Sequence, residues 1–480
     1  MGEGVKLFPD QAEIVAEVRE AMTRSRSVLL QSPTGSGKTA MATHMIEAAK
    51  NKNRKILFSV PRKDLLEQTS DTFSSLGISH GYVAAGKVFN PFARVYIGMV
   101  DTMVRRLDKL PDVDLVIADE THFGDSALDA VLGHYKKKNA WRLGLSATPW
   151  KLSGKGLGCW YDTMVQGKPV RWLMDNGRLS DYQYFAGRTK PDLTGLKVTA
   201  GDYAKGELAG YMEAQGAIIG DCVNDYLQRC MGRLHVVRCA SIKHSQMTAQ
   251  AFRDAGVPAM HVDGETPMDE RKRIFRAYAR REILVLTFCD LLNFGFDLSQ
   301  ASGMDVCIES GSDQRPSKSL AGQMQFWGRM LRAKDYPAII CDHVNNCIEH
   351  GFPDDEREWS LEDRGQGKKA SAERTIPTRQ CPNCFRVHHP MPICPQCSHV
   401  YEIKSRTIEM MEGELKEMTK AEREAMKAQA MQIKKRENSE AYKKGLEGLI
   451  ALGKARGYKY PEGWASKMWT SRQRHRHERG

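Results

Sequence analysis

The sequence has no long apolar run and no apolar stretch at its start. Within its 480 residues, no segment approaches the roughly 20 apolar residues needed to span a bilayer. The opening stretch MGEGVKLFPDQ lacks the apolar core of a secretory signal, and Leu7 stands where a myristoylation motif needs Ser or Thr. We therefore expect a cytoplasmic protein without a membrane partner.

The pattern of a disulfide framework is also missing. Eight of the 12 cysteines are scattered through largely apolar surroundings, which is typical of reduced thiols in a cytosolic protein. The other four lie close together, between residues 381 and 397.

Most of the chain has little net charge. Residues 1–365 hold 47 Lys and Arg against 46 Asp and Glu, whereas residues 366–480 hold 24 against 13. Nearly all of the formal charge of +12 therefore lies in the last quarter. This asymmetry is typical of a neutral catalytic part followed by a basic segment that binds a polyanion.

The stretch SVLLQSPTGSGKTAMATHMIEAA has the pattern of a phosphate-binding loop between a buried strand and a helix. Gly35 and Gly37 let the backbone turn its N–H groups inward, towards an anion at the helix N-terminus. In such a loop Lys38 reaches the β- and γ-phosphates, and the Thr39 hydroxyl ligates magnesium. A glycine-rich turn without a ligand is the alternative. The predicted nucleotide-binding residues of this loop are Pro33, Thr34, Gly35, Ser36, Gly37, Lys38 and Thr39.

The stretch DLVIADETHFG ends a short apolar run with two adjacent carboxylates, Asp119 and Glu120. Four apolar residues are too few for a helix but suit a strand that is buried on both faces. A strand end that reaches water would also explain the charges. Beside a phosphate loop, however, the carboxyl ends of parallel strands meet at the ligand-binding edge of the sheet. We predict that Asp119 holds magnesium through its water shell, and that Glu120 orients or deprotonates the attacking water.

The stretch QFWGRMLRA offers cations for the same reaction. Gln325, Arg329 and Arg332 have the spacing Q-x-x-G-R-x-x-R, and on a helix the two arginines project from one face. An arginine supplied across a cleft accelerates phosphoryl transfer by roughly 10³–10⁵. A solvated basic helix face is the alternative. Strand and helix patterns alternate from residue 234 to residue 288, which predicts a second α/β domain.

Together these motifs resemble those of the superfamily 2 DEAD/DEAH-type helicases. DETH (119–122) resembles motif II, GLSATP (144–149) resembles motif III, and QFWGRMLRA resembles motif VI. The stretches GKGLGCWYDTMVQG, NGRLSDYQYF and GDY are similar to the RadD-like bacterial and phage branch, which is related to type III restriction subunits. Because no nuclease signature accompanies them, the resemblance implies a motor and not a restriction endonuclease.

The resemblance implies further contacts with both substrates. LFPDQ resembles the segment whose glutamine, here Gln11, reads adenine, with Phe8 in place of a frequent arginine. NFGFDLS resembles motif V, with Asp297 on the nucleotide ribose. The stretches SVPRKDLLEQ, IGMVDTM and GET resemble segments that grip a nucleic-acid backbone. The contacts implied there are Pro61, Arg62, Thr102 and Thr266.

The stretch CPNCFRVHHPMPICPQC contains two C-x₂-C pairs, the spacing of a zinc ribbon. Four thiolates complete a tetrahedron and leave no open position for catalysis, so we predict a structural Zn²⁺ site. A histidine in place of one cysteine is a minor alternative. RadD-like proteins carry such a ribbon after the motor, as the resemblance implies. The predicted ligands are Cys381, Cys384, Cys394 and Cys397.

The final stretch, ARGYKYPEGWASKMWTSRQRHRHERG, interleaves aromatic residues with Lys and Arg. Bases stack on aromatic side chains while cations hold the backbone, so we predict that Tyr458, Trp464 and Trp469 bind nucleic acid. A small local core that contains these aromatics is the alternative. A protein partner such as single-stranded-DNA-binding protein is a third interpretation, which the resemblance implies.

We therefore predict an α/β protein with two tandem RecA-like domains on parallel sheets, a small zinc ribbon and a basic helical tail. It would be a monomeric motor of a bacterium or phage that uses ATP and Mg²⁺ to unwind or remodel single-stranded or branched DNA in repair or replication. The alternatives are an RNA helicase and an annealing protein that uses ATP only as a switch. The predicted segments are 1–165 (first RecA-like domain), 166–230 (connecting helices), 231–350 (second RecA-like domain), 351–378 (linker), 379–402 (zinc ribbon) and 403–480 (tail).

Overall fold

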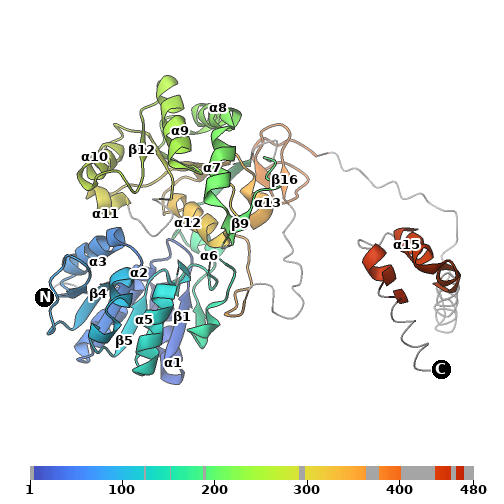
Figure 1. Cartoon of the computed structure of the whole chain (residues 1–480). Coiled ribbons are helices and arrows are strands. Elements are labelled where there is room, and N and C mark those ends of the chain that lie inside the picture. The colour runs from blue at the N-terminus through green and yellow to red at the C-terminus, as the bar shows by residue number, and fades with distance from the viewer. Residues whose placement is uncertain are drawn as a thin grey trace, which may run out of the picture. The chain divides into compact units, whose positions relative to one another are not determined.

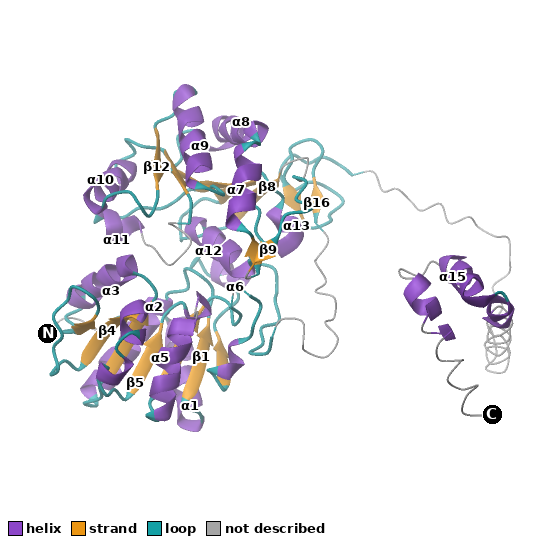
Figure 2. Cartoon of the chain, in the orientation of Figure 1, coloured by secondary structure: helices purple, strands orange, loops and turns teal. Residues whose placement is uncertain are grey.

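The computed structural model describes residues 5–123, 126–151, 153–186, 191–199, 201–290, 298–363, 378–401, 438–455, 461–466 and 468–469. The chain forms two compact units, residues 1–402 and 403–480. The first unit contains two parallel sheets with their helices, and the second is a small group of helices (Figures 1 and 2). Among these residues no helix is both long enough and apolar enough to cross a bilayer.

The first domain is built on seven parallel strands in the order β3-β4-β2-β5-β6-β1-β7. Strands β2 and β5 are short apolar runs with every residue buried, as expected for a sheet that is covered on both faces. The strands are β1 (Ser27–Gln31), β2 (Ile56–Val60), β3 (Gly81–Val83), β4 (Val95–Met99), β5 (Leu115–Ala118), β6 (Trp141–Ser146) and β7 (Thr163–Gln166).

Helices cover both faces of this sheet because successive strand residues point in opposite directions. Ile117 belongs to an apolar cluster with α1, α2 and α3, whereas its neighbour Val116 belongs to a cluster with α4 and α5. The helices are α1 (Pro9–Arg24), α2 (Lys38–Asn51), α3 (Lys63–Ser75), α4 (Val100–Val104) and α5 (Ser126–Lys137), with single turns at Leu107–Lys109, Thr121–Phe123 and Leu157–Cys159.

The second domain has six parallel strands in the order β12-β13-β11-β14-β15-β8. Its edge strand β8 comes from the segment that we predicted as connecting helices, and pairs with β15. The sheet therefore takes up residues well before position 231. The strands are β8 (Tyr182–Ala186), β11 (His235–Arg238), β12 (Ala259–Val262), β13 (Val285–Phe288), β14 (Ser310–Asp313) and β15 (Ala338–Asp342).

Two apolar clusters again cover the two faces of the second sheet. One cluster includes residues of α6, α10, α11 and α12, and the other includes residues of α8 and α9. The helices are α6 (Val170–Asp175), α7 (Lys205–Glu213), α8 (Gly216–Asp225), α9 (Ile242–Asp254), α10 (Met268–Ala279), α11 (Leu298–Ser302), α12 (Leu320–Met330) and α13 (Asn346–His350). A π-helical turn at Tyr226–Cys230 extends α8, and β9 (Val198–Thr199) pairs with β10 (Asp202–Tyr203).

A short antiparallel pair, β16 (Arg379–Gln380) and β17 (Val387–His388), begins the cysteine-rich segment. Arg386 forms an antiparallel bridge with Phe185 of β8, and the Gln380 side-chain amide donates to the Ala186 carbonyl oxygen. Val387 joins the apolar core of the second domain. The ribbon thus covers the otherwise open edge of the second sheet, where unpaired backbone groups would remain.

The second unit has a small core of its own, around Ala441, Leu449 and Ala465. Its helix α15 (Gly445–Ala455) is accompanied by helical residues 438–443 and 461–466. The predicted fold class, two parallel α/β sheets with a four-cysteine segment and a helical C-terminal region, is confirmed.

Candidate nucleotide site between two α/β domains

The phosphate loop joins β1 to α2 and begins that helix at Lys38. Gly35 and Gly37 both have a φ of +86°, a conformation that side chains rarely adopt. The Lys38 ammonium donates to the carbonyl oxygens of Ser32 (3.1 Å) and Pro33 (3.2 Å), so its positive charge lies directly on the loop. The two glycine conformations and the helix N-terminus give a cradle that suits phosphate.

Gln11 joins helix α1 to this loop. Its Oε1 accepts the Phe8 N–H at 3.1 Å, and its Nε2 donates to the Ser36 carbonyl oxygen at 3.0 Å. A Cβ added at Gly37 would lie 2.4 Å from Gln11 Nε2, so a side chain there would displace the Gln11 amide. Gln11 therefore lies against the loop, where the motif resemblance places it.

Arg178 is a residue near the loop that sequence reasoning did not find. Its guanidinium lies 3.2 Å from the centroid of the Phe8 ring and donates to Asp10 Oδ1 at 2.6 Å. The next residue, Leu179, would contact a Cβ added at Gly35 at 2.9 Å. An arginine distant in sequence thus stacks on Phe8, which occupies the position of the arginine frequent in relatives. No spacing rule links residue 178 to residue 8.

The carboxylate pair follows β5 at the same edge of the first sheet. Glu120 has a φ of +46°, which is uncommon for a residue with a side chain, and Asp119 Oδ1 accepts the Glu120 N–H at 3.0 Å. Burial, together with the negative charge of Glu120, raises the pKa of Asp119 to about 7. The two carboxylates lie near Lys38 of the phosphate loop, whose positive charge acts on Asp119, and they offer the hard oxygen ligands that Mg²⁺ prefers.

His122 links this pair to the end of β6. Its Nδ1 lies 3.4 Å from Glu120 Oε2 and 2.8 Å from Ser146 Oγ. Burial lowers the pKa of His122 to about 4, so the ring is neutral at physiological pH. The Thr148 N–H in turn donates to Ser146 Oγ at 3.1 Å. Motifs II and III are therefore joined by hydrogen bonds.

Helix α12 of the second domain contacts both parts of this site. Gln325 Nε2 donates to Glu120 Oε1 at 2.9 Å, and a Cβ added at Gly328 would lie only 2.4 Å from Thr34 Cβ. Arg329, one residue further, is buried. Arg332 instead lies near α11, with Nη1 3.4 Å from Ser299 Oγ. The glycine of the Q-x-x-G-R pattern is thus the point where the helix and the phosphate loop meet.

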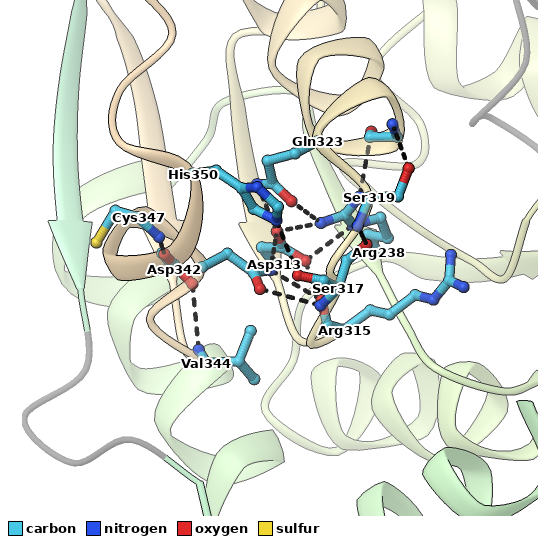
Figure 3. Close-up of polar contacts among 12 residues, drawn as sticks. Arg238, Asp313, Arg315, Ser317, Ser319, Gln323, Asp342, Val344, Cys347 and His350 are labelled. Atoms are coloured by element: carbon cyan, nitrogen blue, oxygen red, sulfur yellow. Dashed lines mark hydrogen bonds and ion pairs between the residues drawn. The ribbon is translucent and has the colours of Figure 1, made fainter. Parts of the chain in front are cut away.

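A buried polar network holds α12 on the carboxyl edge of the second sheet (Figure 3). Arg238 at the end of β11 donates from Nε to Asp313 Oδ1 at 2.9 Å. Gln323 of α12 donates to Asp313 Oδ2 at 3.0 Å, and Asn346 does so at 2.9 Å. Burial opposes the charge of Asp313, but the Arg238 guanidinium and these hydrogen bonds lower its pKa. The network fixes the start of the helix that carries Gln325.

The four predicted zinc ligands lie together. Their sulfur atoms are all within 4.8 Å of one another, and the pairs Cys381–Cys397 and Cys384–Cys394 are each 3.6 Å apart. A tetrahedron of 2.3 Å zinc–sulfur bonds separates its sulfurs by about 3.8 Å, so the set fits Zn²⁺. Within the described part of the chain, this is the one group of three or more His, Cys, Asp or Glu side chains that could hold a metal ion.

Both cysteine pairs have the same backbone turn. Phe385 (φ +62°) and Ser398 (φ +56°) follow the pairs, and each donates its N–H to the carbonyl oxygen of the first cysteine, at 2.9 and 3.0 Å. His388 Nε2 lies 2.7 Å from the Tyr401 hydroxyl instead of joining the sulfurs. The histidine alternative therefore has no support in this arrangement.

The predicted nucleic-acid contacts come from several elements of the chain. Pro61 and Arg62 follow β2, and Arg62 is exposed. Thr102 is buried, and its hydroxyl accepts the Ala85 N–H at 3.3 Å. Thr266 donates to Asp263 Oδ1 at 3.0 Å in a partly exposed turn. Asp297 and Tyr458 lie outside the described residues.

The two tail tryptophans take part in a local core. Trp464 and Trp469 pack against the cluster around Leu449, and Trp469 stacks on Tyr442 with ring centroids 6.2 Å apart. These are the contacts of the local-core alternative. Base stacking by these residues stays a prediction.

Several known proteins are similar to this chain in sequence. Residues 4–151 match the family described as "Type III restriction enzyme, res subunit". A "51.5 kDa protein" of Lactococcus phage (isolate 7-9) is 32% identical over 411 residues, 85% of this chain and 85% of the relative. The "Putative ATP-dependent helicase IRC3" of Saccharomyces cerevisiae is 25% identical, over 69% of this chain and 50% of the relative.

Among solved structures, the "putative HsdR subunit of a type I restriction enzyme" from Vibrio vulnificus YJ016 has a similar fold. The TM-score is 0.56 at 18% sequence identity, over 74% of this chain and 67% of that chain. Two α/β domains on parallel sheets, of which the first carries the phosphate loop and the second contacts it, are the arrangement of a helicase-type ATPase. The chain belongs to superfamily 2 of the ATP-dependent helicases, in the branch related to type III restriction subunits. It is accordingly an ATP-dependent enzyme whose substrate is a nucleic acid.

Proposed function

We propose that the protein couples ATP hydrolysis to movement along DNA, and that it unwinds or remodels branched DNA in repair or replication. The observation that carries this proposal is the 2.9 Å hydrogen bond from Gln325 of the second domain to Glu120 of the first. A movement of Asp119 and Glu120 would therefore alter a contact between the two domains. A translocating motor needs two domains that contact the same nucleic-acid strand and move relative to each other.

The residues around the phosphate loop have distinct proposed roles. Lys38 and the loop N–H groups would bind the triphosphate, and Thr39 and Asp119 would hold Mg²⁺. The ion would neutralise charge on the phosphate oxygens. Glu120 would accept the proton of the attacking water, oriented by Gln325, while Arg329 and Arg332 would oppose the charge of the phosphoryl group. Gln11 would contact the base, and Asp297 the ribose.

Nucleic acid is proposed to lie across both domains at Pro61, Arg62, Thr102 and Thr266. Kinship with restriction-enzyme subunits supports DNA as the substrate. The basic tail would add affinity through phosphate contacts, and Trp464, Trp469 and Tyr458 through base stacking. We further propose that the motor acts as a monomer in a bacterial cytoplasm, and that the tail also binds single-stranded-DNA-binding protein.

The test is ATPase turnover measured with single-stranded DNA, duplex DNA, forked DNA and RNA. We expect the strongest stimulation by single-stranded or forked DNA. Lys38→Ala should abolish turnover and leave DNA binding largely intact, whereas Lys52→Ala, an exposed lysine at the end of the same helix, should leave both unchanged. Normal turnover in Lys38→Ala would overturn the motor. If RNA stimulates ATPase turnover more strongly than DNA does, the substrate is RNA. Strand annealing without turnover would support the alternative in which ATP acts only as a switch.

A further inference from the structure

The chain crosses from the second domain back to the first after α13. Residues 352–363, here called the return segment, begin in the second domain, where Phe352 is part of the apolar core. Arg357 holds this end by donating to the carbonyl oxygens of His350 (3.0 Å) and Asp355 (2.8 Å). Asp354 accepts a hydrogen bond from Arg171 of α6 at 3.2 Å. The first half of the return segment is therefore anchored in the second domain.

The second half is anchored in the first domain, directly after motif III. Gly158 N–H donates to the Leu361 carbonyl oxygen at 2.9 Å, and Gly156 N–H donates to Asp363 Oδ1 at 2.8 Å. Trp150 Nε1 donates to the Glu362 carbonyl oxygen at 3.0 Å. The chain approaches so closely that a Cβ added at Gly156 would lie 2.1 Å from the Leu361 carbonyl oxygen. The second half of the return segment therefore packs closely against the loop that contains Gly156 and Gly158.

Two tryptophans complete this contact. Trp150 of the first domain lies with its ring centroid 5.1 Å from that of Trp359 in the return segment, and both pack with the core of the second domain. A small cavity lies beside them, lined by Thr148, Trp150 and Lys151 from one domain and Lys318–Ala321 from the other. The interface between the domains is therefore incompletely packed here, and the return segment adds contacts beside the cavity.

The contact reaches the carboxylate pair through motif III. Thr148 Oγ1 lies 3.4 Å from the Trp150 carbonyl oxygen, and the Thr148 N–H donates to Ser146 Oγ, which contacts His122. His122 is the neighbour of Glu120. The second domain is thus connected to Glu120 twice, through Gln325 directly and through the return segment by way of motif III.

We propose that the return segment is a positioning element for ATP hydrolysis: its docking on Trp150, Gly156 and Gly158 holds motif III and keeps the two domains in the arrangement in which Gln325 contacts Glu120, here called the closed form. The proposal rests on the proposed motor function. Docking favours the closed form because the anchors lie on both domains, and separation of the domains has to break them. An affinity that depends on a closed form changes in proportion to the population of that form.

The test uses the full-length chain with changes on either side of the contact. Gly156→Ala inserts a methyl group against Leu361, and its backbone φ is not positive, so the change acts through the contact alone. Trp359→Ala removes the ring on the return segment. Gly210→Ala in α7 is the matched control, because nothing lies within 4 Å of its added Cβ. If docking raises the closed population about tenfold, each test variant raises the KM for ATP about tenfold.

Two readouts separate positioning from a loss of fold. Dyes at the exposed positions Glu17 and Gln246 report the distance between the domains by energy transfer, without ATP or nucleic acid. Hydrogen exchange of residues 150–160 reports the N–H groups of Gly156 and Gly158, which the docked segment protects. We expect both test variants to shift the energy-transfer distribution and to lose protection, with an unchanged thermal midpoint of each domain. The double variant should equal either single variant, since both remove one contact.

Wild-type KM and wild-type energy transfer in both test variants would overturn the proposal. Additive effects in the double variant would also contradict it, because they would indicate two independent local changes. Lys38→Ala must keep the wild-type energy-transfer distribution. If the return segment is docked but the wild-type enzyme has no ATPase activity, the proposed motor function is refuted. If the enzyme is active while the return segment is undocked, this inference is refuted.

Discussion

The contact between Gly328 and Thr34 gives the sharpest quantitative expectation. A methyl group added at Gly328 would lie 2.4 Å from Thr34 Cβ and 2.5 Å from its Cγ2. Carbon atoms pack at about 3.5–4.0 Å, so α12 and the phosphate loop must separate by about 1 Å. Displacements of this size at reacting groups cost about 100-fold in rate. We therefore expect Gly328→Ala to lower kcat for nucleic-acid-stimulated ATPase by about 10–100-fold.

The same substitution should not weaken the second domain. Alanine is better than glycine inside a helix by about 1 kcal/mol, which opposes the cost of the contact between domains. The thermal midpoint is accordingly expected to stay unchanged or rise while kcat falls. Gly322→Ala in the same helix is the control, since its added Cβ would meet Ser319 Oγ at an ordinary 3.4 Å. Wild-type kcat and KM in Gly328→Ala would refute the reasoning, because they would mean that α12 does not pack on the loop in the active enzyme.

Three further expectations concern charge, metal and tail. In metal-free buffer, Asp119→Asn should raise the thermal midpoint much more at pH 8 than at pH 4.5. Because the pKa of Asp119 is raised to about 7, its ionisation weakens the fold increasingly as pH rises from about 4 to about 7. Equal shifts at both pH values would contradict this. Cys381→Ser should lose bound zinc, measured by elemental analysis. Cys159→Ser, which changes an exposed cysteine outside the ribbon, should keep one zinc ion per chain. A full complement of zinc in Cys381→Ser would exclude the site. Deletion from residue 403 should weaken DNA binding and make its salt dependence shallower, because cationic phosphate contacts are lost, and an unchanged slope in salt titrations would favour the local-core or protein-docking role.

The parts of this site that could be predicted are those whose chemistry is local. The positive φ of Gly35 and Gly37 follows from residues that tolerate it, and the end of β5 follows from an apolar run that stops at Asp119. The two cysteine pairs likewise carry their turn geometry within a few residues. In each case the physical cause is contained in a short stretch, so the stretch alone indicates it.

What could not be predicted depends on which surfaces meet. Nothing in the stretch YQYFA indicates that β8 joins the edge of the second sheet, because edge pairing is decided by the rest of that sheet. Arg178 reaches Phe8 only because α6 ends beside the phosphate loop. Trp464 and Trp469 have the composition of a stacking surface, yet aromatic rings gain equally from packing together in a core, and the structure places them there.

Gly156 and Gly158 show how such a surface can be recognised after the fold is known. In the sequence GKGLG they indicate only a flexible loop, since glycine serves turns and close contacts alike. Neither has the positive φ that would require glycine for its backbone, so the reason for glycine must lie outside the loop. The Leu361 carbonyl oxygen, 2.1 and 2.9 Å from their added Cβ atoms, is that reason. Gly156 and Gly158 therefore mark a close contact with a segment about 200 residues away in the sequence, and this contact ties the loop after motif III to the return segment.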